Sequence, residues 1–194
     1  MIFVPDVTIV TLDKNLSEST SDTDKLPLLS PMSEIAGQLA FVVGSNYLLK
    51  HNMGIGKLLG YSDDLDSAIV TVVGAGSAGK QAISKAIVNG AHVKIIDLSE
   101  EKLIELESEF GSFHIEYIKS SPAAIFEAVK HTDLLIGAVY EVGKTAPKVF
   151  TTDMIKSMKP GSVFVDISID QGGCSETSKP TTHAEPTYIV DDVV

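Results

Sequence analysis

The chain has 194 residues and a net charge of −11, from 15 basic and 26 acidic side chains. With 44% hydrophobic residues, it is long enough for one sizeable globular domain, or for one domain with an appended segment. The negative charge argues against nucleic acid and anionic membrane surfaces as partners. No apolar run approaches the roughly 20 residues that span a bilayer, so we expect no membrane segment.

The basic residues and the cysteine content narrow the class further. All 15 basic residues are lysines. The sequence therefore has no guanidinium group, the group that usually binds carboxylates and phosphates through two parallel hydrogen bonds. The first residues lack the basic region and cleavage site of a secretory signal, and Cys174 has no second cysteine to pair with. These features favour a cytoplasmic protein.

The first third of the chain differs from the rest. Residues 7–12 could form a strand, but residues 13–25 are polar and charged, and we expect residues 1–25 to form a flexible lead-in. Residues 26–66 contain a predicted long helix and a glycine-containing loop. The helix begins with Ser30 and Pro31, a favourable N-cap and first-turn pair, and runs to about residue 50. The loop at 51–66 leads into the next domain.

Residues 67–194 alternate between apolar strands and amphipathic helices. Strands are predicted at 68–73, 92–97, 113–117, 133–139, 162–167 and 187–190, and helices at 78–89, 100–110, 122–130 and 152–158. Strands joined by helical crossovers form a parallel sheet that is covered on both faces. The predicted fold is therefore α/β, a doubly wound parallel sheet of the Rossmann type with a long leading helix.

A glycine motif lies where the first of these strands meets its helix. Gly74, Gly76 and Gly79 have the G-x-G-x-x-G spacing, and the next strand ends in Asp97. In this pattern the first glycine makes the turn, the second lets the backbone approach a pyrophosphate, and the third lets helix and strand pack closely. The helix N-terminus favours the phosphate charge. The motif predicts a dinucleotide site, the alternative being a tight turn without a ligand.

Asp97 predicts which dinucleotide binds. A carboxylate at this position accepts hydrogen bonds from the adenosine ribose hydroxyls and repels a 2′-phosphate. The lack of arginine argues in the same direction. We therefore expect NAD rather than NADP.

Several segments, in the same order, resemble the alanine dehydrogenase and pyridine nucleotide transhydrogenase family. They are residues 26–37, 74–79, 133–139, 146–148, 158–162, 165–174 and 180–183. The resemblance covers about residues 26–194, and the Ile-Asp-Gln-Gly-Gly-Cys run at 169–174 is closer to alanine dehydrogenase. It implies an enzyme that oxidatively deaminates L-alanine to pyruvate and ammonia with NAD.

The resemblance also implies roles for individual residues. Asp170 matches the family's aspartate beside the nicotinamide, Asp97 matches the ribose-binding acid, and Lys102 matches a lysine on the same half of the cofactor. The positions expected to contact the cofactor are Gly74, Ala75, Gly76, Ser77, Ala78, Gly79, Asp97, Lys102, Ser33, Ser120, Val139 and Ile167. From sequence alone, Asp170 could equally be a turn residue before two glycines, and Lys102 a solvated helix lysine.

The family's substrate-binding arginine and its catalytic lysine and histidine lie in an N-terminal domain with no counterpart here, and its C-terminal segment is absent too. We therefore interpret the chain as a truncated enzyme or a domain, which should bind NAD more readily than it turns over alanine. One hypothesis is an alanine dehydrogenase completed by other sequence. The other is an NAD-binding module, or a transhydrogenase-like nucleotide domain, without activity of its own. By family analogy the oligomer is a hexamer, with the long helix as an interface element.

The remaining polar residues are expected to be structural. Asp166 lies within an apolar strand and is interpreted as a hydrogen-bonding carboxylate, and Cys174 as a small side chain near the cleft rather than a nucleophile. Lys144 and Lys148 are expected at the surface, the alternative being a contact with the cleft. The five histidines show no metal-ligand spacing, so no metal site is predicted; of these, His183 is the one with a possible further role.

Overall fold

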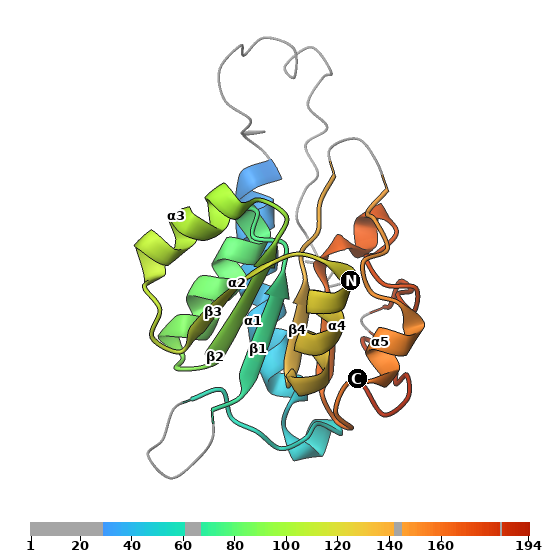
Figure 1. Cartoon of the computed structure of the whole chain (residues 1–194). Helices are drawn as coiled ribbons and strands as arrows, with labels where there is room; N and C mark the ends of the chain where they lie inside the picture. The colour runs from blue at the N-terminus through green and yellow to red at the C-terminus, as the bar shows by residue number, and fades with distance from the viewer. Residues whose placement is uncertain (1–28, 61–66, 142–144, 183) are drawn as a thin grey trace.

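The computed structural model describes residues 29–60, 67–141, 145–182 and 184–194 (Figure 1). The predicted lead-in at 1–25, with its possible strand at 7–12, lies outside these residues, as do Lys144 and His183. Among the described helices, none is both long and apolar enough to cross a membrane.

The described strands form one five-stranded parallel sheet in the order β3-β2-β1-β4-β5. Their bounds are β1 Ile69–Val73, β2 His92–Asp97, β3 Ile115–Lys119, β4 Leu134–Gly137 and β5 Val163–Asp166. Strand β1 lies at the centre, and its residues Val70 to Val73 are all buried, as is typical of a parallel strand covered on both sides. This confirms the predicted fold class.

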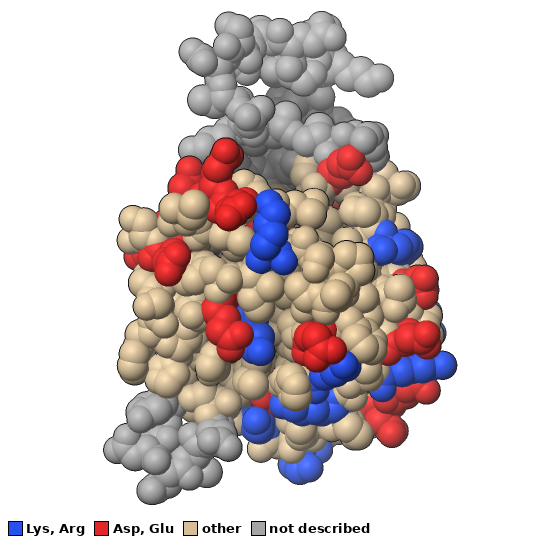
Figure 2. All heavy atoms as spheres, in the orientation of Figure 1, with Lys and Arg blue, Asp and Glu red and all other residues tan. Residues whose placement is uncertain are grey.

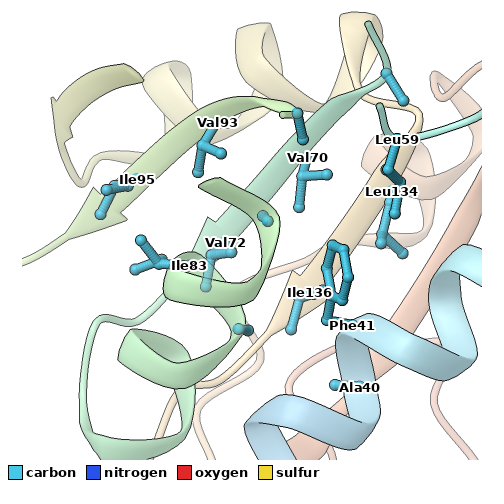
Figure 3. Close-up of a cluster of buried hydrophobic side chains, with 14 of the residues drawn as sticks. Ala40, Phe41, Leu59, Val70, Val72, Ile83, Val93, Ile95, Leu134 and Ile136 are labelled. Atoms are coloured by element: carbon cyan, nitrogen blue, oxygen red, sulfur yellow. The ribbon is translucent and has the colours of Figure 1, made fainter. Parts of the chain in front are cut away.

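Helices cover both faces of the sheet. On one face α1 (Leu29–Tyr47), α2 (Ser77–Val88) and α3 (Glu100–Phe110) share a buried cluster with alternate strand residues, including Val70 and Val72. On the other, α4 (Pro122–His131) and α5 (Thr152–Lys156) pack on residues such as Val73. Figure 1 shows α4 on the near side of the sheet and α1 behind it, and Figure 3 shows the first cluster, where Phe41 and Ile83 meet the strands.

Most helix and strand boundaries lie within three residues of those predicted, and β4 and α5 each end two residues early. Two further differences have a local cause. Strand β3 begins two residues later than predicted, because Phe113 is 84% exposed and His114 has a left-handed φ of 58°. The predicted strand at 187–190 is wrong. Only Val190 forms a bridge, to Val193, across a turn in which Asp191 and Asp192 both have positive φ.

The chain beyond that turn lies against the free edge of the sheet. The Val194 N–H donates to Ser162 O at 3.0 Å, and the Phe164 N–H donates to Val194 O at 2.8 Å. These two bonds place Val194 parallel to β5. A sixth position in the sheet is thus occupied, but by residues that follow the predicted strand.

A cluster of two half-buried lysines around one buried carboxylate closes the end of the sheet opposite the carboxyl ends of the strands. Asp133 is fully buried and accepts hydrogen bonds from Lys57 Nζ at 3.0 Å, Lys159 Nζ at 2.8 Å and the Ile69 N–H at 2.8 Å. Burial alone would raise the pKa of the Asp133 carboxyl, but these hydrogen bonds outweigh it and hold that pKa below its ordinary value. The cluster ties the loop after the short 3-10 helix η2 (Lys50–Asn52) to β1 and β4.

Charged side chains are interspersed over the visible surface. Figure 2 shows lysines and acidic residues side by side across the described part of this face. Opposite charges at such spacing partly offset one another on this face.

Candidate functional site

The glycine loop joins β1 to α2 and leaves one position open. Gly74 has a φ of +94°, and a Cβ there would lie 2.4 Å from Ala138 O. A Cβ on Gly79 would lie 1.8 Å from Gly74 O, whereas a Cβ on Gly76 would meet no atom within 4 Å. The first and third glycines are thus required by packing. The second faces open space, as the motif predicts for the position that approaches a ligand.

The N-terminus of α2 lies directly behind this open position. Gly76 is the N-cap residue, and no side chain caps the helix. The first backbone N–H groups of a helix have no acceptor within the helix. In α2 these are the N–H groups of Ser77, Ala78 and Gly79. Together with the helix dipole, they make this end of the helix suitable for an anion.

Asp97 ends β2 and holds the glycine loop in place. Its Oδ2 accepts a hydrogen bond from the Ala75 N–H at 2.7 Å, and its Oδ1 accepts one from the Ser99 N–H at 2.8 Å. Ser99 also caps α3 through the Lys102 N–H, so Lys102 lies in the first turn of the helix that follows Asp97. The Ser120 N–H donates to Asp97 O at 2.9 Å. The structure therefore brings the loop, Asp97, Lys102 and Ser120 together.

The opposite wall is built from the segments that follow β4 and β5. Ser168 Oγ donates to Val139 O at 2.6 Å and so joins the two segments. Ile167 begins the 3-10 helix η3 (Ile167–Gln171), in which Asp170 is exposed. Ser168 was not among the predicted residues. Its N–H donates to Asp166 Oδ1 at 2.9 Å in an Asx turn, but nothing in the sequence indicates the bond from its Oγ to Val139 O.

Asp166 organises the loop beyond η3. Besides the bond from Ser168, its carboxylate accepts hydrogen bonds from the Cys174 N–H at 2.8 Å, from Cys174 Sγ at 3.2 Å and from Ser178 Oγ. These contacts support the interpretation of Asp166 as a hydrogen-bonding carboxylate.

Cys174 is completely buried beside this carboxylate. Burial, with the negative charge of Asp166, raises the pKa of its thiol far above the ordinary value. A Cβ on Gly137 would lie 2.4 Å from its sulfur, so the thiol fills the space at the end of β4. A buried, protonated thiol is a poor nucleophile, in line with the sequence interpretation.

Lys148 makes contacts that the sequence did not predict. It is exposed, as expected, but its Nζ donates to Gly172 O at 2.6 Å and to Ser175 O at 2.9 Å. It therefore ties the segment after β4 to the turn that follows Asp170.

Ser33 lies on α1 rather than on one of the segments that follow the strands. It precedes Gly37 by about one helical turn, and a Cβ on Gly37 would lie 2.0 Å from Ala78 O. This face of α1 therefore approaches the start of α2. No group of residues among those described could hold a metal ion.

The two walls meet where the order of the strands reverses. From β1 the chain winds outward through β2 to β3, then returns to β4 on the other side of β1 and continues to β5. In open α/β sheets, ligands bind outside the carboxyl ends of the strands at this switch point. The glycine loop and Val139 follow β1 and β4 there, which identifies this edge as the candidate nucleotide site.

The chain is similar in sequence to known alanine dehydrogenases. It is 47% identical to the alanine dehydrogenase of Halomonas elongata over 90% of this chain and 47% of the relative, and 48% identical to that of Mycolicibacterium smegmatis over 87% and 45%. The chain thus spans about half the length of these relatives.

Solved structures give the same result. An L-alanine dehydrogenase superimposes with a TM-score of 0.84 at 43% identity, covering 87% of this chain and 46% of that one. A transhydrogenase from Sinorhizobium meliloti gives 0.72 at 26% identity, covering 86% and 47%. Residues 40–194 match the family described as "Alanine dehydrogenase/PNT, C-terminal domain". The chain, a nucleotide-binding domain of the Rossmann type, therefore belongs to the alanine dehydrogenase/PNT C-terminal domain family.

Proposed function

We propose that this chain binds NAD(H) and forms the nucleotide-binding half of an alanine dehydrogenase. The observation that carries the proposal is the open backbone at Gly76, in front of an uncapped helix N-terminus. A pyrophosphate would accept hydrogen bonds from the N–H groups at the start of α2. Any side chain at position 76 would fill this cradle, so the local geometry fits the cofactor's phosphates.

Asp97 would hold the adenosine ribose. Each of its carboxylate oxygens accepts one backbone N–H, and a carboxylate oxygen can accept a second hydrogen bond. The ribose hydroxyls would supply these bonds, whereas a 2′-phosphate would meet a negative charge and no arginine. We therefore infer a preference for NAD over NADP. Lys102, Ser120 and Ser33 would contact the same half of the cofactor or line its cleft.

Asp170 would lie beside the nicotinamide, with Val139 and Ile167 lining the cleft. A bound nicotinamide would supply the acceptor for the hydride of the amino acid's α-carbon. The Asp170 carboxylate, exposed in η3, would orient polar groups at that end of the cofactor or hold a proton there. The groups that bind and deprotonate the substrate would come from sequence outside this chain or from another chain.

Titration calorimetry with NADH and NADPH tests the cofactor proposal. We expect NADH to bind at least tenfold more tightly, on the order of 1.4 kcal/mol, and equal affinities would contradict the role of Asp97. Replacing Asp97 with Gly should reduce the difference between the two cofactors. Glu105→Gln, which removes a negative charge from the exposed side of α3, is the matched control.

A steady-state assay with L-alanine and NAD distinguishes the two candidate functions. Turnover by the purified chain above background would show a working enzyme. NADH binding without turnover is expected of both candidates for the isolated chain, because the chain spans only 47% of its Halomonas elongata relative. The assay is therefore repeated with the missing half of an alanine dehydrogenase supplied: turnover then supports the dehydrogenase half, and its absence supports the binding module. A transhydrogenase-like nucleotide domain would bind the cofactor but transfer no hydride from alanine, even when it is supplied with the missing half of an alanine dehydrogenase.

We further infer that the chain forms homo-oligomers through α1, with a hexamer as the expected state. Met32, Ile35 and Val42 are 52–57% exposed on this helix, and Glu34 is its single charged residue. An uncharged apolar strip suits a second copy of a chain whose net charge is −11. Sedimentation velocity should show an oligomer that Ile35→Glu dissociates, while Lys156→Glu on α5 leaves it intact.

The buried reduced Cys174 is compatible with the reducing cytoplasm as the compartment.

A further inference from the structure

The turn that follows Asp170 contains a peptide group that is held from both sides. The carbonyl of Gly172 accepts a hydrogen bond from Lys148 Nζ at 2.6 Å, and the N–H of Gly173, in the same peptide, donates to Ser168 O at 2.9 Å. A further bond from the Gly172 N–H to Ile169 O closes the turn that contains Asp170. The orientation of this peptide therefore bears on where Asp170 lies.

Packing alone does not fix the Gly172 side of this peptide. Both glycines have positive φ, +93° at Gly172 and +77° at Gly173. A Cβ on Gly173 would lie 2.8 Å from Asp166 Oδ2, but one on Gly172 would meet nothing within 4 Å. A glycine in open space can rotate its carbonyl at little steric cost. The Lys148 ammonium is the described group that holds this carbonyl.

The backbone around Lys148 is itself anchored. The Ala146 N–H donates to Gln171 O at 2.9 Å, and the Val149 N–H donates to Cys174 O at 2.8 Å. These bonds place the segment before α5 alongside the segment after η3, so the lysine side chain starts from a fixed point. Its second bond, to Ser175 O at 2.9 Å, limits where the ammonium can lie.

We propose that Lys148 is a positioning residue for Asp170: it fixes the Gly172–Gly173 peptide and thereby the end of η3 that would face the nicotinamide. The inference rests on the proposed binding of NAD(H). It assigns Lys148 an effect on the nicotinamide half of the cofactor alone, because the glycine loop and Asp97 lie on the other wall and have no contact with Lys148 among those described.

Two ligands separate the two halves of the cleft. NADH reaches both walls, whereas ADP-ribose lacks the nicotinamide and reaches the glycine loop and Asp97. By calorimetry, Lys148→Met should weaken NADH about tenfold and ADP-ribose less than about twofold. Lys148→Arg, which keeps a cationic donor, should restore most of the affinity. Lys156→Met, which removes an exposed lysine from the end of α5, is the matched control and should change neither ligand.

Amide hydrogen exchange tests the positioning without any ligand. The Gly173 N–H should exchange about tenfold faster in Lys148→Met than in the parent chain, and Lys148→Arg should restore its protection. Unchanged NADH affinity, an equal loss for ADP-ribose, or unchanged Gly173 exchange would each overturn the proposal. If the parent chain binds neither ligand, the NAD(H) proposal fails, while hydrogen exchange still decides whether Lys148 positions the turn.

Discussion

The glycine loop permits a prediction in which two neighbouring glycines respond differently to the same added methyl group. Gly79→Ala places the methyl against Gly74 O, and Gly76→Ala places it in open space. The first change should therefore affect folding. The second should affect ligand binding while it leaves the fold nearly unchanged.

The sizes of these effects follow from the contacts. At Gly79 the new Cβ would lie 1.8 Å from a backbone oxygen, whereas ordinary contact begins near 3.4 Å, so loop and helix must separate by about 1.6 Å. Overpacking of this kind costs about 3 kcal/mol, and the better helix propensity of alanine returns about 1 kcal/mol. We expect the free energy of unfolding to fall by about 2 kcal/mol. At Gly76, where φ is −69°, alanine is only a poorer N-cap and costs about 0.5–1 kcal/mol.

Urea unfolding followed by far-UV circular dichroism measures the first effect, because the chain has no tryptophan to report by fluorescence. Calorimetric titration with NADH measures the second. Gly76→Ala should weaken NADH by at least about tenfold, since its methyl group separates the pyrophosphate from the backbone N–H groups.

The reasoning would be refuted by either of two results. One is a free energy of unfolding for Gly79→Ala that lies within about 0.5 kcal/mol of the parent value, because the clash with Gly74 O would then carry no cost. The other is an NADH affinity of Gly76→Ala equal to that of the parent chain, because the phosphates would then lie elsewhere.

Three further outcomes are expected. The folded-state pKa of Asp133 lies below its unfolded value, so its contribution to stability is present above about pH 4 and is lost as the pH falls towards the folded pKa. Asp133→Asn should therefore lose less stability in acid than the parent chain does. Urea unfolding at several pH values measures this difference. The Cys174 thiol should not react with a disulfide reagent at neutral pH until the chain unfolds, and a fast native reaction would contradict its burial. Ser168→Ala removes the bond to Val139 O and should lower the free energy of unfolding by about 1 kcal/mol, measured as for Gly79.

The sequence predicted the architecture well where the hydrophobic pattern of an element agrees with the residues that begin or end it. β2 and α3 have the predicted bounds, because an apolar run ends at Asp97 and a serine N-cap follows at once. The segment at 187–190 shows where strand propensity misleads. Its β-branched and aromatic residues are typical of a strand, yet two left-handed aspartates follow and turn the chain, so that only Val190 forms a bridge. Short apolar runs carry too little information about what they pack against.

Less of the candidate site could be predicted than of the fold. The glycine motif and Asp97 were found because their spacing follows one local strand-turn-helix-strand unit. Lys148 and Ser168 act through carbonyl oxygens that are distant in the sequence, and any lysine or serine sequence context is compatible with such a bond. The contacts that join the wall after β4 to the wall after β5 are therefore a property of the tertiary structure.

The close contact between Gly79 and Gly74 also has a kinetic consequence. Because no side chain separates the first turn of α2 from the loop after β1, helix and loop must move as one body. A phosphate arriving there meets N–H donors that already point outward, so little ordering remains to be done after encounter. Association should accordingly be a single step, with an observed rate that rises linearly with ligand concentration and reaches no plateau.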